Sequence, residues 1–372
     1  MSTQTPARAA DDLGWQLGAL LTRWRAAVGA VLDGIPAGPR GYHLLRVAVA
    51  ADVPPTQAAL ASHLGIDRTV MTYLLDDLCD AGLVERCPDP ADRRVRRIAA
   101  TEAGRAALAD VEARHGVRLG VHALDTVTGA TASHRADERF AFCSTVKPLA
   151  AAAVLAARGV DGMDERVPVE AADLVTYSPV TEQRVGVGMT WRELVDAALR
   201  FSDNTAGNLL LAGAGGPAAL TAWLRGLGDD VTRSDRTEPD LNAFVPGDER
   251  DTSTPGALAG TYRTLVLGDA LGGPERDLLT DAMLRSTTGD ALVRAAARPG
   301  WEVADKSGAG AYATRNDVAV VWTGARGTAA GAPVVLAVLS DRADPGAERT
   351  DAPVAEAARV VLDALVGRRP TA

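Results

Sequence analysis

Lysine is almost absent from this chain of 372 residues. Only two lysines occur, Lys147 and Lys306, against 37 arginines. A lysine ammonium can lose its proton where its surroundings lower its pKa, whereas a guanidinium stays charged. We therefore expect both lysines to occupy sites that arginine could not serve, and the residues around them are the first place to look for chemistry.

Other absences exclude whole classes of protein. No run of about eighteen apolar residues occurs, so no membrane-spanning helix is expected. The three cysteines form neither an even framework nor a C-x-x-C pair. The five histidines show no H-x-H or H-E-x-x-H spacing, which argues against a zinc hydrolase, and we expect no metal and no cofactor.

The compartment follows from two further absences. Residues 1–18 lack an apolar core with a small-residue cleavage site, so no secretory signal is expected. The cysteine pattern indicates a reducing environment. Together these observations predict a cytoplasmic protein.

Length and charge divide the chain. A sequence of 372 residues predicts two or three domains. Residues 1–115 hold 13 basic and 14 acidic side chains, and the remainder holds 26 and 34, for a net charge of −9. The acidic excess lies in the second part, which makes that part a poor candidate for contact with nucleic acid.

The first part predicts helices followed by a pair of strands. Helical spacing of apolar residues covers 15–32, and a second helix is expected at about 42–49. A short helix, a turn at Gly65 and a longer helix, capped by Asp67 and ending near Asp80, have the layout of a helix-turn-helix.

Two strands, 83–86 and 95–98, flank a polar tip with the sequence D-P-A-D-R-R. With T-E-A-G-R at 101–105, this stretch resembles the winged helix-turn-helix of MarR-type transcriptional regulators, over about residues 13–105. The resemblance implies double-stranded DNA as a partner of residues 56–98, with the second helix in the major groove and the wing on phosphate or in the minor groove. The residues expected to contact DNA are Arg68, Thr69, Thr72, Tyr73, Arg93, Arg94 and Arg96.

Two features leave DNA binding and the oligomeric state open. Such regulators dimerise through their first helix and two long C-terminal helices, but here a single helix, 102–114, follows the wing. The near-neutral charge of this part also predicts little non-specific affinity for DNA.

The second part predicts a sheet assembled from both of its ends. Helix-forming and irregular sequence fills 144–298, and a site is expected where this helical part meets the sheet. The expected strands are 117–123, 133–136, 301–306, 316–323 and 333–339, and a final helix is expected at 352–365.

Three motifs carry candidate chemistry. Ser144 and Lys147 are three residues apart, which at a helix N-terminus stacks an amine over a hydroxyl, and a neutral lysine could accept the serine proton. Ser202-Asp203-Asn204 falls between two helices, the first capped by the box Thr190-Trp191-Arg192-Glu193, and would aim a hydroxyl and an amide into a cleft. Lys306-Ser307-Gly308-Ala309 ends a strand, where an ammonium and amide donors can receive a carboxylate.

In this order, S-x-x-K, S-D-N and K-S-G resemble the signature of class A β-lactamases and penicillin-binding proteins, with serine in place of the threonine of K-T-G. Residues 236–242 and 248–252 are similar to the omega loop of class A enzymes, which an Arg236–Asp251 ion pair would pin. The resemblance covers about residues 102–372. It implies an α/β plus all-α two-subdomain serine β-lactamase/penicillin-binding-protein-like fold, preceded by a winged helix-turn-helix domain.

The two resemblances imply a MarR-like winged helix-turn-helix domain at 1–101 and a class A β-lactamase domain at 102–372. In the latter, the sheet part would comprise 102–143 and 299–372, and the helical part 144–298. The helix at 102–114 would belong to both domains, and no Gly/Ser-rich linker separates them, so rigid coupling is expected.

The β-lactamase resemblance assigns roles to the site residues. Ser144 would attack the lactam carbonyl, with its proton taken by Lys147 or by Glu238 through water. The backbone N–H groups of Ser144 and Ala309 would form the oxyanion hole, and Ser202 would pass a proton to the leaving nitrogen.

Glu238 and Asn242 decide between turnover and trapping. A penicillin-binding protein or a sensor keeps its acyl-serine, whereas hydrolysis needs a carboxylate to activate water and an amide to hold it. The resemblance therefore implies hydrolysis of penicillin- and cephalosporin-type antibiotics, and with it antibiotic resistance. Two alternatives stay open: a transcription factor whose hydrolase half senses β-lactams, and a peptidase acting on D-Ala-D-Ala ends.

The resemblance also implies substrate contacts. Asn204 would bond the acylamide side chain, Tyr177 would form one wall, and the carboxylate would be held by Lys306, Ser307 and Arg315. For Arg315, a surface position is the alternative.

Two structural features complete the expectations. Arg294 and Asp305 look like a buried ion pair. Cys143 has a cysteine counterpart in disulfide-bearing relatives, but the partner position is Gly310 here, so a free, buried thiol is expected.

Overall fold

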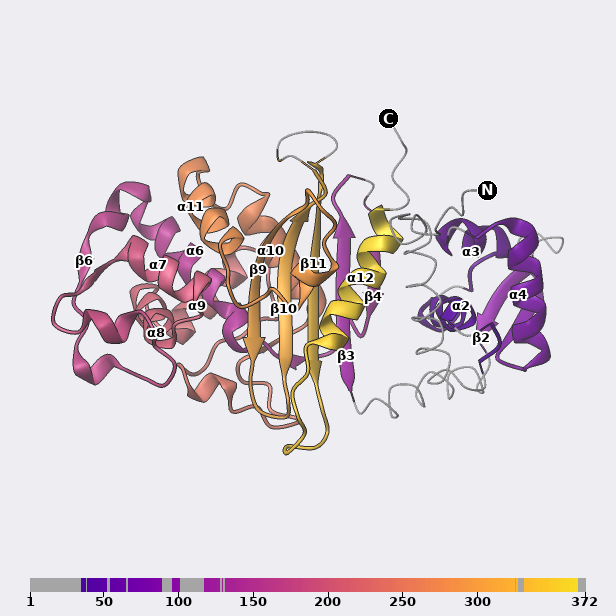
Figure 1. The fold of residues 1–372 in the computed structure, drawn as a ribbon, viewed down its shortest axis with the longest axis horizontal. Helices are drawn as coiled ribbons and strands as arrows, with labels where there is room; N and C mark the ends of the chain where they lie inside the picture. The colour runs from indigo at the N-terminus through magenta and orange to yellow at the C-terminus, as the bar shows by residue number, and fades with distance from the viewer. Residues whose placement is uncertain are drawn as a thin grey trace, which may run out of the picture. The chain divides into compact units, whose positions relative to one another are not determined.

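The computed structural model of the protein describes residues 35–37, 39–51, 54–64, 66–88, 96–100, 117–127, 129, 131–324, 326 and 331–366. The chain divides into two compact units, residues 1–116 and 117–372 (Figure 1). The expected helices at 15–32 and 102–114 lie outside the described residues, as do Arg93 and Arg94 of the polar tip.

The first unit contains the two expected helices of the helix-turn-helix and the two strands of the wing, whereas Gly65 of the expected turn and residues 89–95 of the tip lie outside the described residues. Asp67 caps the second helix of the motif, because its carboxylate accepts hydrogen bonds from the N–H groups of Thr69, at 2.8 Å, and Val70. The wing strands are antiparallel, with Val84 opposite Ala100. The described elements are α2 (Pro39–Ala50), α3 (Gln57–Leu64), α4 (Arg68–Asp80), β1 (Val84–Pro88) and β2 (Arg96–Ala100).

A small apolar core determines which face of α4 is buried and which is exposed. Met71, Leu75 and Leu78 of α4 are fully buried against Leu44 and Leu60. Residues three or four apart lie on one helix face, so this packing turns the intervening positions of α4 outward.

The second unit is built on an antiparallel sheet with the order β4-β3-β11-β10-β9. Strands from the two ends of the unit pair directly, since Val121 lies opposite Val338. The strands are β3 (Arg118–Asp125), β4 (Thr131–His134), β9 (Glu302–Ala309), β10 (Arg315–Trp322) and β11 (Pro333–Asp341).

One expected strand is shifted. The sequence favours a strand at 133–136, but β4 covers Thr131–His134. It ends there because Arg135 adopts a left-handed backbone conformation, with φ of 47°. Left-handed φ values interrupt extended backbone, and a helical or strand period does not reveal them in advance.

Each face of the sheet packs against helices. Ala319 and Val321 belong to the cluster under α12 (Ala352–Val366), whereas Val318 and Val320 belong to the cluster shared with the helical layer. This alternation follows from the two-residue period of a strand. Figure 1 shows α12 on one face of the sheet and α10 (Pro255–Val266) on the other.

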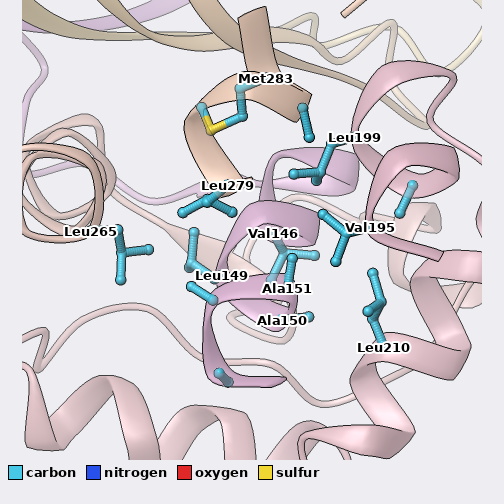
Figure 2. Close-up of a cluster of buried hydrophobic side chains, with 14 of the residues drawn as sticks. Val146, Leu149, Ala150, Ala151, Val195, Leu199, Leu210, Leu265, Leu279 and Met283 are labelled. Carbon is cyan, nitrogen blue, oxygen red and sulfur yellow. The ribbon is translucent and has the colours of Figure 1, made fainter. Parts of the chain in front are cut away.

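The helical layer surrounds α6 (Lys147–Arg158). Alanines 150 to 153 are buried on this helix, and their small size lets the neighbouring helices approach closely. Figure 2 shows leucines and valines from the neighbouring helices packed around it. The other helices of the layer are α7 (Trp191–Arg200), α8 (Asn204–Gly213), α9 (Pro217–Gly226) and α11 (Gly273–Leu284).

Short elements join these layers. They are β5 (Phe140–Ala141), η1 (Cys143–Val146), η2 (Val160–Asp164), β6 (Arg166–Val167), η3 (Ala171–Asp173), η4 (Thr181–Arg184), β7 (Met189–Thr190), η5 (Asp240–Asn242), β8 (Thr252–Ser253) and η6 (Val293–Ala296). Within the part of the chain that the structure describes, no helix is long and apolar enough to cross a membrane.

Two glycines of the helical layer should respond oppositely to alanine. A Cβ at Gly213 would lie 2.4 Å from the Trp191 ring, whereas Gly260 is exposed in the middle of α10 with nothing within 4 Å. Gly213→Ala should therefore lower the free energy of unfolding by about 1–3 kcal/mol, and Gly260→Ala should raise it by about 0.4–1 kcal/mol. Urea unfolding of the two variants checks this, and shifts of the same sign would contradict the described packing.

Candidate active site

Ser144 lies in a buried 3-10 turn at the entrance to α6. The sequence predicts a helix N-terminus here, and the structure places the turn η1 first, with α6 beginning at Lys147. Ser144 is 8% exposed. The turn and the strand before it are anchored from the core, since Tyr262 Oη donates to Thr145 O of the turn at 2.8 Å and Asn316 Nδ2 donates to Ala141 O of β5 at 2.7 Å.

Lys147 is buried beside the Ser202–Asn204 triplet. Its Nζ donates to Ser202 O at 2.8 Å and to Asn204 Oδ1 at 2.6 Å, and it lies 3.4 Å from Ser202 Oγ. Burial lowers the pKa of Lys147, and the charge of Glu238 opposes that shift. The neutral amine is therefore easier to reach here than for a lysine on the surface.

The triplet lies between two capped helices, as its sequence predicts. Thr190 and Glu193 form the expected capping box of α7. Asp203, which sequence reasoning left without a role, is fully buried and caps α8 by accepting from Ala206 N–H at 2.9 Å. Its carboxylate also accepts from Thr181 N–H at 3.0 Å, which ties the triplet to η4.

A single carboxylate oxygen joins the first motif to the omega loop. Ser144 Oγ donates to Glu238 Oε1 at 3.0 Å, and Lys147 Nζ lies 3.1 Å from the same oxygen. The Asn242 amide donates to Glu238 Oε2. Glu238 is 3% exposed, so the nucleophile, the lysine and the carboxylate meet out of contact with bulk water.

Asn208 holds the carboxylate residue in place, and sequence reasoning missed it. The Glu238 N–H donates to Asn208 Oδ1 at 2.8 Å, and Asn208 Nδ2 donates to Glu238 O at 2.9 Å. Asn208 is four residues after Asn204 on α8, so both lie on one helix face. The spacing of four residues between Asn204 and Asn208 is the feature of the sequence that could have identified Asn208.

The expected ion pair of the omega loop is confirmed. Arg236 Nε lies 2.5 Å from Asp251 Oδ2, and Asp251 is fully buried. Asp251 Oδ1 accepts from the N–H groups of Asp235, at 2.8 Å, and Arg236, at 3.0 Å. The Glu238–Pro239 peptide between these anchors is cis.

The second lysine approaches Ser202 from the sheet. Lys306, on the edge strand β9, is fully buried and donates to Ser202 Oγ at 3.0 Å and to Ser307 O at 2.9 Å. Burial lowers its pKa to about 7, and the positive charge of Lys147 acts in the same direction. Ser202 Oγ thus lies between the two lysines of the chain.

The other expected substrate residues lie around this network. Ser307 Oγ donates to Thr288 Oγ1 at 2.8 Å, and Arg315 Nε lies 2.6 Å from Asp351 Oδ1. Ala309 is opposite Arg315 in the β9–β10 ladder. Strand alternation puts these residues on the α12 side of the sheet, opposite to Lys306.

Tyr177 lies next to the triplet. Its side chain is 61% exposed, and its carbonyl accepts from the Asn204 N–H at 2.9 Å. The position is therefore at the edge of the site rather than inside it.

The two buried features expected from the sequence are confirmed. Arg294 Nε lies 2.5 Å from Asp305 Oδ1, and burial raises the pKa of Asp305. Cys143 is a free, buried cysteine, and burial raises the pKa of its thiol. A Cβ on Gly310 would lie 2.7 Å from Cys143 Sγ, so position 310 does face this thiol.

The outward face of α4 carries part of the expected DNA-contacting set. Thr69 and Tyr73 are exposed, the latter by 67%, and Thr72 Oγ1 accepts from Gln57 Nε2 at 2.9 Å. For Arg68 and Arg96 the structure describes the backbone only. Among all described residues, no group of three or more His, Cys, Asp or Glu side chains is arranged to hold a metal ion.

Comparison with known proteins identifies both parts of the chain. Residues 104–365 match the beta-lactamase enzyme family, and residues 44–95 match the MarR family. A beta-lactamase of Amycolatopsis lactamdurans is 52% identical over 255 residues, which are 68% of this chain and 83% of the relative. A beta-lactamase of Bacillus licheniformis is 48% identical over 257 residues, 69% of this chain and 82% of the relative.

Solved structures agree with these relatives. A halotolerant bacterial beta-lactamase is 46% identical, with a TM-score of 0.66, and the match covers 69% of this chain and 97% of that chain. A class A beta-lactamase from Mycobacterium abscessus is also 46% identical, with a TM-score of 0.64 and coverage of 70% and 98%. The chain therefore belongs to the beta-lactamase enzyme family, with a class A fold preceded by a MarR-family module.

Proposed function

We propose that this protein hydrolyses the β-lactam ring of penicillin- and cephalosporin-type antibiotics through an acyl-serine on Ser144, and so confers antibiotic resistance. One observation carries the proposal: Glu238 Oε1 lies within hydrogen-bond distance of both Ser144 Oγ and Lys147 Nζ. Relatives named beta-lactamases, 48–52% identical over about two thirds of this chain, support it.

Acylation begins with attack of Ser144 Oγ on the lactam carbonyl. Its proton passes to Glu238, which already accepts a hydrogen bond from it, or to Lys147, whose pKa burial lowers. The N–H groups of Ser144 and Ala309 stabilise the oxyanion of the tetrahedral intermediate. The C–N bond of the ring then breaks, and the nitrogen needs a proton.

Ser202 supplies that proton. Its Oγ lies 3.0 Å from Lys306 Nζ and 3.4 Å from Lys147 Nζ, so either ammonium can replace the proton that Ser202 gives to the nitrogen. A hydroxyl between two cations is a better donor than one in water, because the positive charges stabilise its conjugate base.

Deacylation depends on Glu238 and Asn242. Glu238 takes a proton from a water molecule as that water attacks the ester on Ser144. The bond between the acyl carbon and Ser144 Oγ then breaks, Glu238 returns the proton to Ser144 Oγ, and the opened ring leaves as a carboxylic acid. Asn242 Nδ2 donates to Glu238, while Asn242 Oδ1 is buried and accepts no hydrogen bond within the described structure. That oxygen is available to accept from the attacking water and to orient it.

Substrate binding uses both sides of the edge strand. Lys306, Ser307 and Arg315 hold the carboxylate, Asn204 bonds the acylamide side chain, and Tyr177 forms one wall. Arg315 uses Nε for Asp351, which leaves four of its five N–H donors for a substrate. β9 is an edge strand, so side chains from either face of the sheet can reach a molecule lying along it.

We further propose that the module ahead of the enzyme binds double-stranded DNA through residues 56–98. The cap at Asp67 and the exposed Thr69 and Tyr73 support this, since they give α4 an outward face that fits the major groove. Arg68, Thr72, Arg93, Arg94 and Arg96 complete the proposed set. A module that binds DNA acts in the compartment that contains the chromosome, which supports a cytoplasmic location. It also supports a β-lactam-responsive regulator as the second candidate function.

The domain limits proposed for these activities are 1–101 and 102–372. The enzyme domain comprises a sheet part, 102–143 and 299–372, and a helical part, 144–298. Position 144 would then mark the passage from sheet to helices, consistent with the nucleophile turn lying between β5 and α6.

Loss of the Glu238 carboxylate should trap the acyl-enzyme. Glu238→Ala is expected to lower deacylation by about 10²–10⁴-fold, since a general base contributes that much. Ser144→Ala should abolish covalent labelling altogether. Intact-protein mass spectrometry after mixing with benzylpenicillin checks both. Glu182→Ala, at an exposed position on η4, serves as the control, and unchanged steady-state turnover in Glu238→Ala would refute the assigned role.

The pH dependence of substrate capture should report on Lys306. A lysine is cationic below its pKa, so a pKa of about 7 means that raising the pH from 6 to 9 removes the charge that attracts the substrate carboxylate. We expect kcat/KM to fall across about pH 7 in the parent enzyme. In Lys306→Arg the side chain stays charged, so kcat/KM should not fall across this pH range. Identical profiles for the two proteins would place the titration elsewhere.

DNA binding should depend on the outward face of α4. In gel shifts on fragments from the gene's own upstream region, Tyr73→Ala is expected to weaken specific binding by about tenfold, and higher salt should weaken it further. Its β-lactam hydrolysis should equal that of the parent, which controls for folding. No shift of any fragment by the parent protein at low salt would exclude the regulator.

A further inference from the structure

The loop that carries Glu238 and Asn242 contacts the β9–β10 turn through two aromatic rings that the catalytic scheme does not use. The rings of Phe244 and Tyr312 meet edge to face, with centroids 6.1 Å apart and planes at 78°. With Ala141 and Cys143 they form an apolar cluster separate from the main core, and Phe244 is only 6% exposed. We call Phe244 and Tyr312 the aromatic clamp.

The turn under this clamp has a strained backbone. Tyr312 and Ala313 have φ values of 54° and 51°, two consecutive left-handed residues, and the Thr314 N–H donates to Ala311 O at 3.0 Å. Such hairpin turns favour asparagine and glycine, because a Cβ is disfavoured at positive φ. Tyrosine and alanine stay in this conformation only where surrounding contacts hold them there.

The surrounding contacts connect the turn to the catalytic loop. The Ala311 N–H donates to Asn242 O at 3.0 Å, and Tyr312 O accepts from the Arg342 N–H at 2.8 Å. A Cβ on Gly310 would lie 2.9 Å from Asn242 O and 2.7 Å from Cys143 Sγ. The end of β9, the loop and the nucleophile turn therefore lie against one another with no room for one more carbon.

We propose that Phe244 and Tyr312 are positioning residues for deacylation. Their ring contact keeps Asn242 against the β9–β10 turn, and Asn242 in turn holds the Glu238 carboxylate beside Ser144. This inference rests on the proposed function. Small displacements of a catalytic base lower the rate by up to about 100-fold. A loop that is held at one end only would therefore not keep the Glu238 carboxylate in position for catalysis.

Four variants test whether the clamp positions the loop for deacylation. Phe244→Ala and Tyr312→Ala remove one ring each, and Tyr312→Phe keeps the ring without its hydroxyl. Trp301→Ala removes a ring from the cluster on the α12 side of the sheet and serves as a control for lost packing.

Single-turnover kinetics followed by mass spectrometry gives the first readout. With benzylpenicillin, both clamp alanine variants should deacylate about tenfold more slowly, while acylation stays within about twofold of the parent. Tyr312→Phe and Trp301→Ala should behave like the parent. Deacylation at the parent rate in both alanine variants, or equal slowing in Trp301→Ala, would overturn the proposal.

Hydrogen exchange gives a second readout that needs no turnover. The amide of Ala311 and those of residues 236–251 should exchange faster in the clamp alanine variants than in Trp301→Ala, and unchanged exchange would overturn the clamp. A parent protein that fails to hydrolyse any β-lactam would defeat the proposed function, while exchange would still decide the clamp. If an alanine variant does not fold, Phe244→Leu replaces it, with the same expectation of faster exchange.

Discussion

Burial of the Glu238 carboxylate between a hydroxyl and an ammonium is the interaction on which the site depends. A carboxylate out of water is costly unless a cation and hydrogen-bond donors compensate it. Lys147 supplies the cation, but its own burial is tolerable only because Ser202 O and Asn204 Oδ1 accept from it. The S-x-x-K and S-D-N motifs are therefore coupled to the omega loop through these contacts. Removing the charge of Glu238 or of Lys147 would leave the other charge buried and unpaired.

The fold meets this demand by bringing together residues from separate parts of the chain. Ser144 enters from a turn between β5 and α6, Ser202 from the gap between α7 and α8, and Lys306 from an edge strand. The omega loop has little regular structure apart from η5, and there the anchors are side chains. The Asn208 side chain hydrogen-bonds both the N–H and the C=O of Glu238, and the Asp251 carboxylate accepts from the backbone at the start of the loop. The loop is thus positioned by these polar contacts together with the ring contact between Phe244 and Tyr312.

Sequence patterns predicted most of the framework, and they predicted which motifs the structure brings together at the candidate site, because both have local signatures. Helix caps at Asp67 and Thr190, alternating strands and three short motifs are all readable within a few residues. What the sequence did not reveal depends on chain segments far apart. Asn208 contacts Glu238 across 30 positions in the sequence, Arg315 contacts Asp351 across 36, and Phe244 contacts Tyr312 from a distant turn of the sheet. The end of β4 at Arg135 was missed for another reason: a left-handed residue leaves no periodic trace.

The location of both lysines has a practical consequence. Lys147 and Lys306 are 2% and 0% exposed, and they are the only lysines in the chain. The folded surface therefore offers no ε-amine, and its positive charge is carried by guanidinium groups, which resist acylation at neutral pH. Lysine-directed reagents, such as biotin esters and bifunctional linkers, could reach an ε-amine only at Lys147 or Lys306, inside the pocket. Attaching the protein to a support through these amines would therefore compete with binding of its substrates.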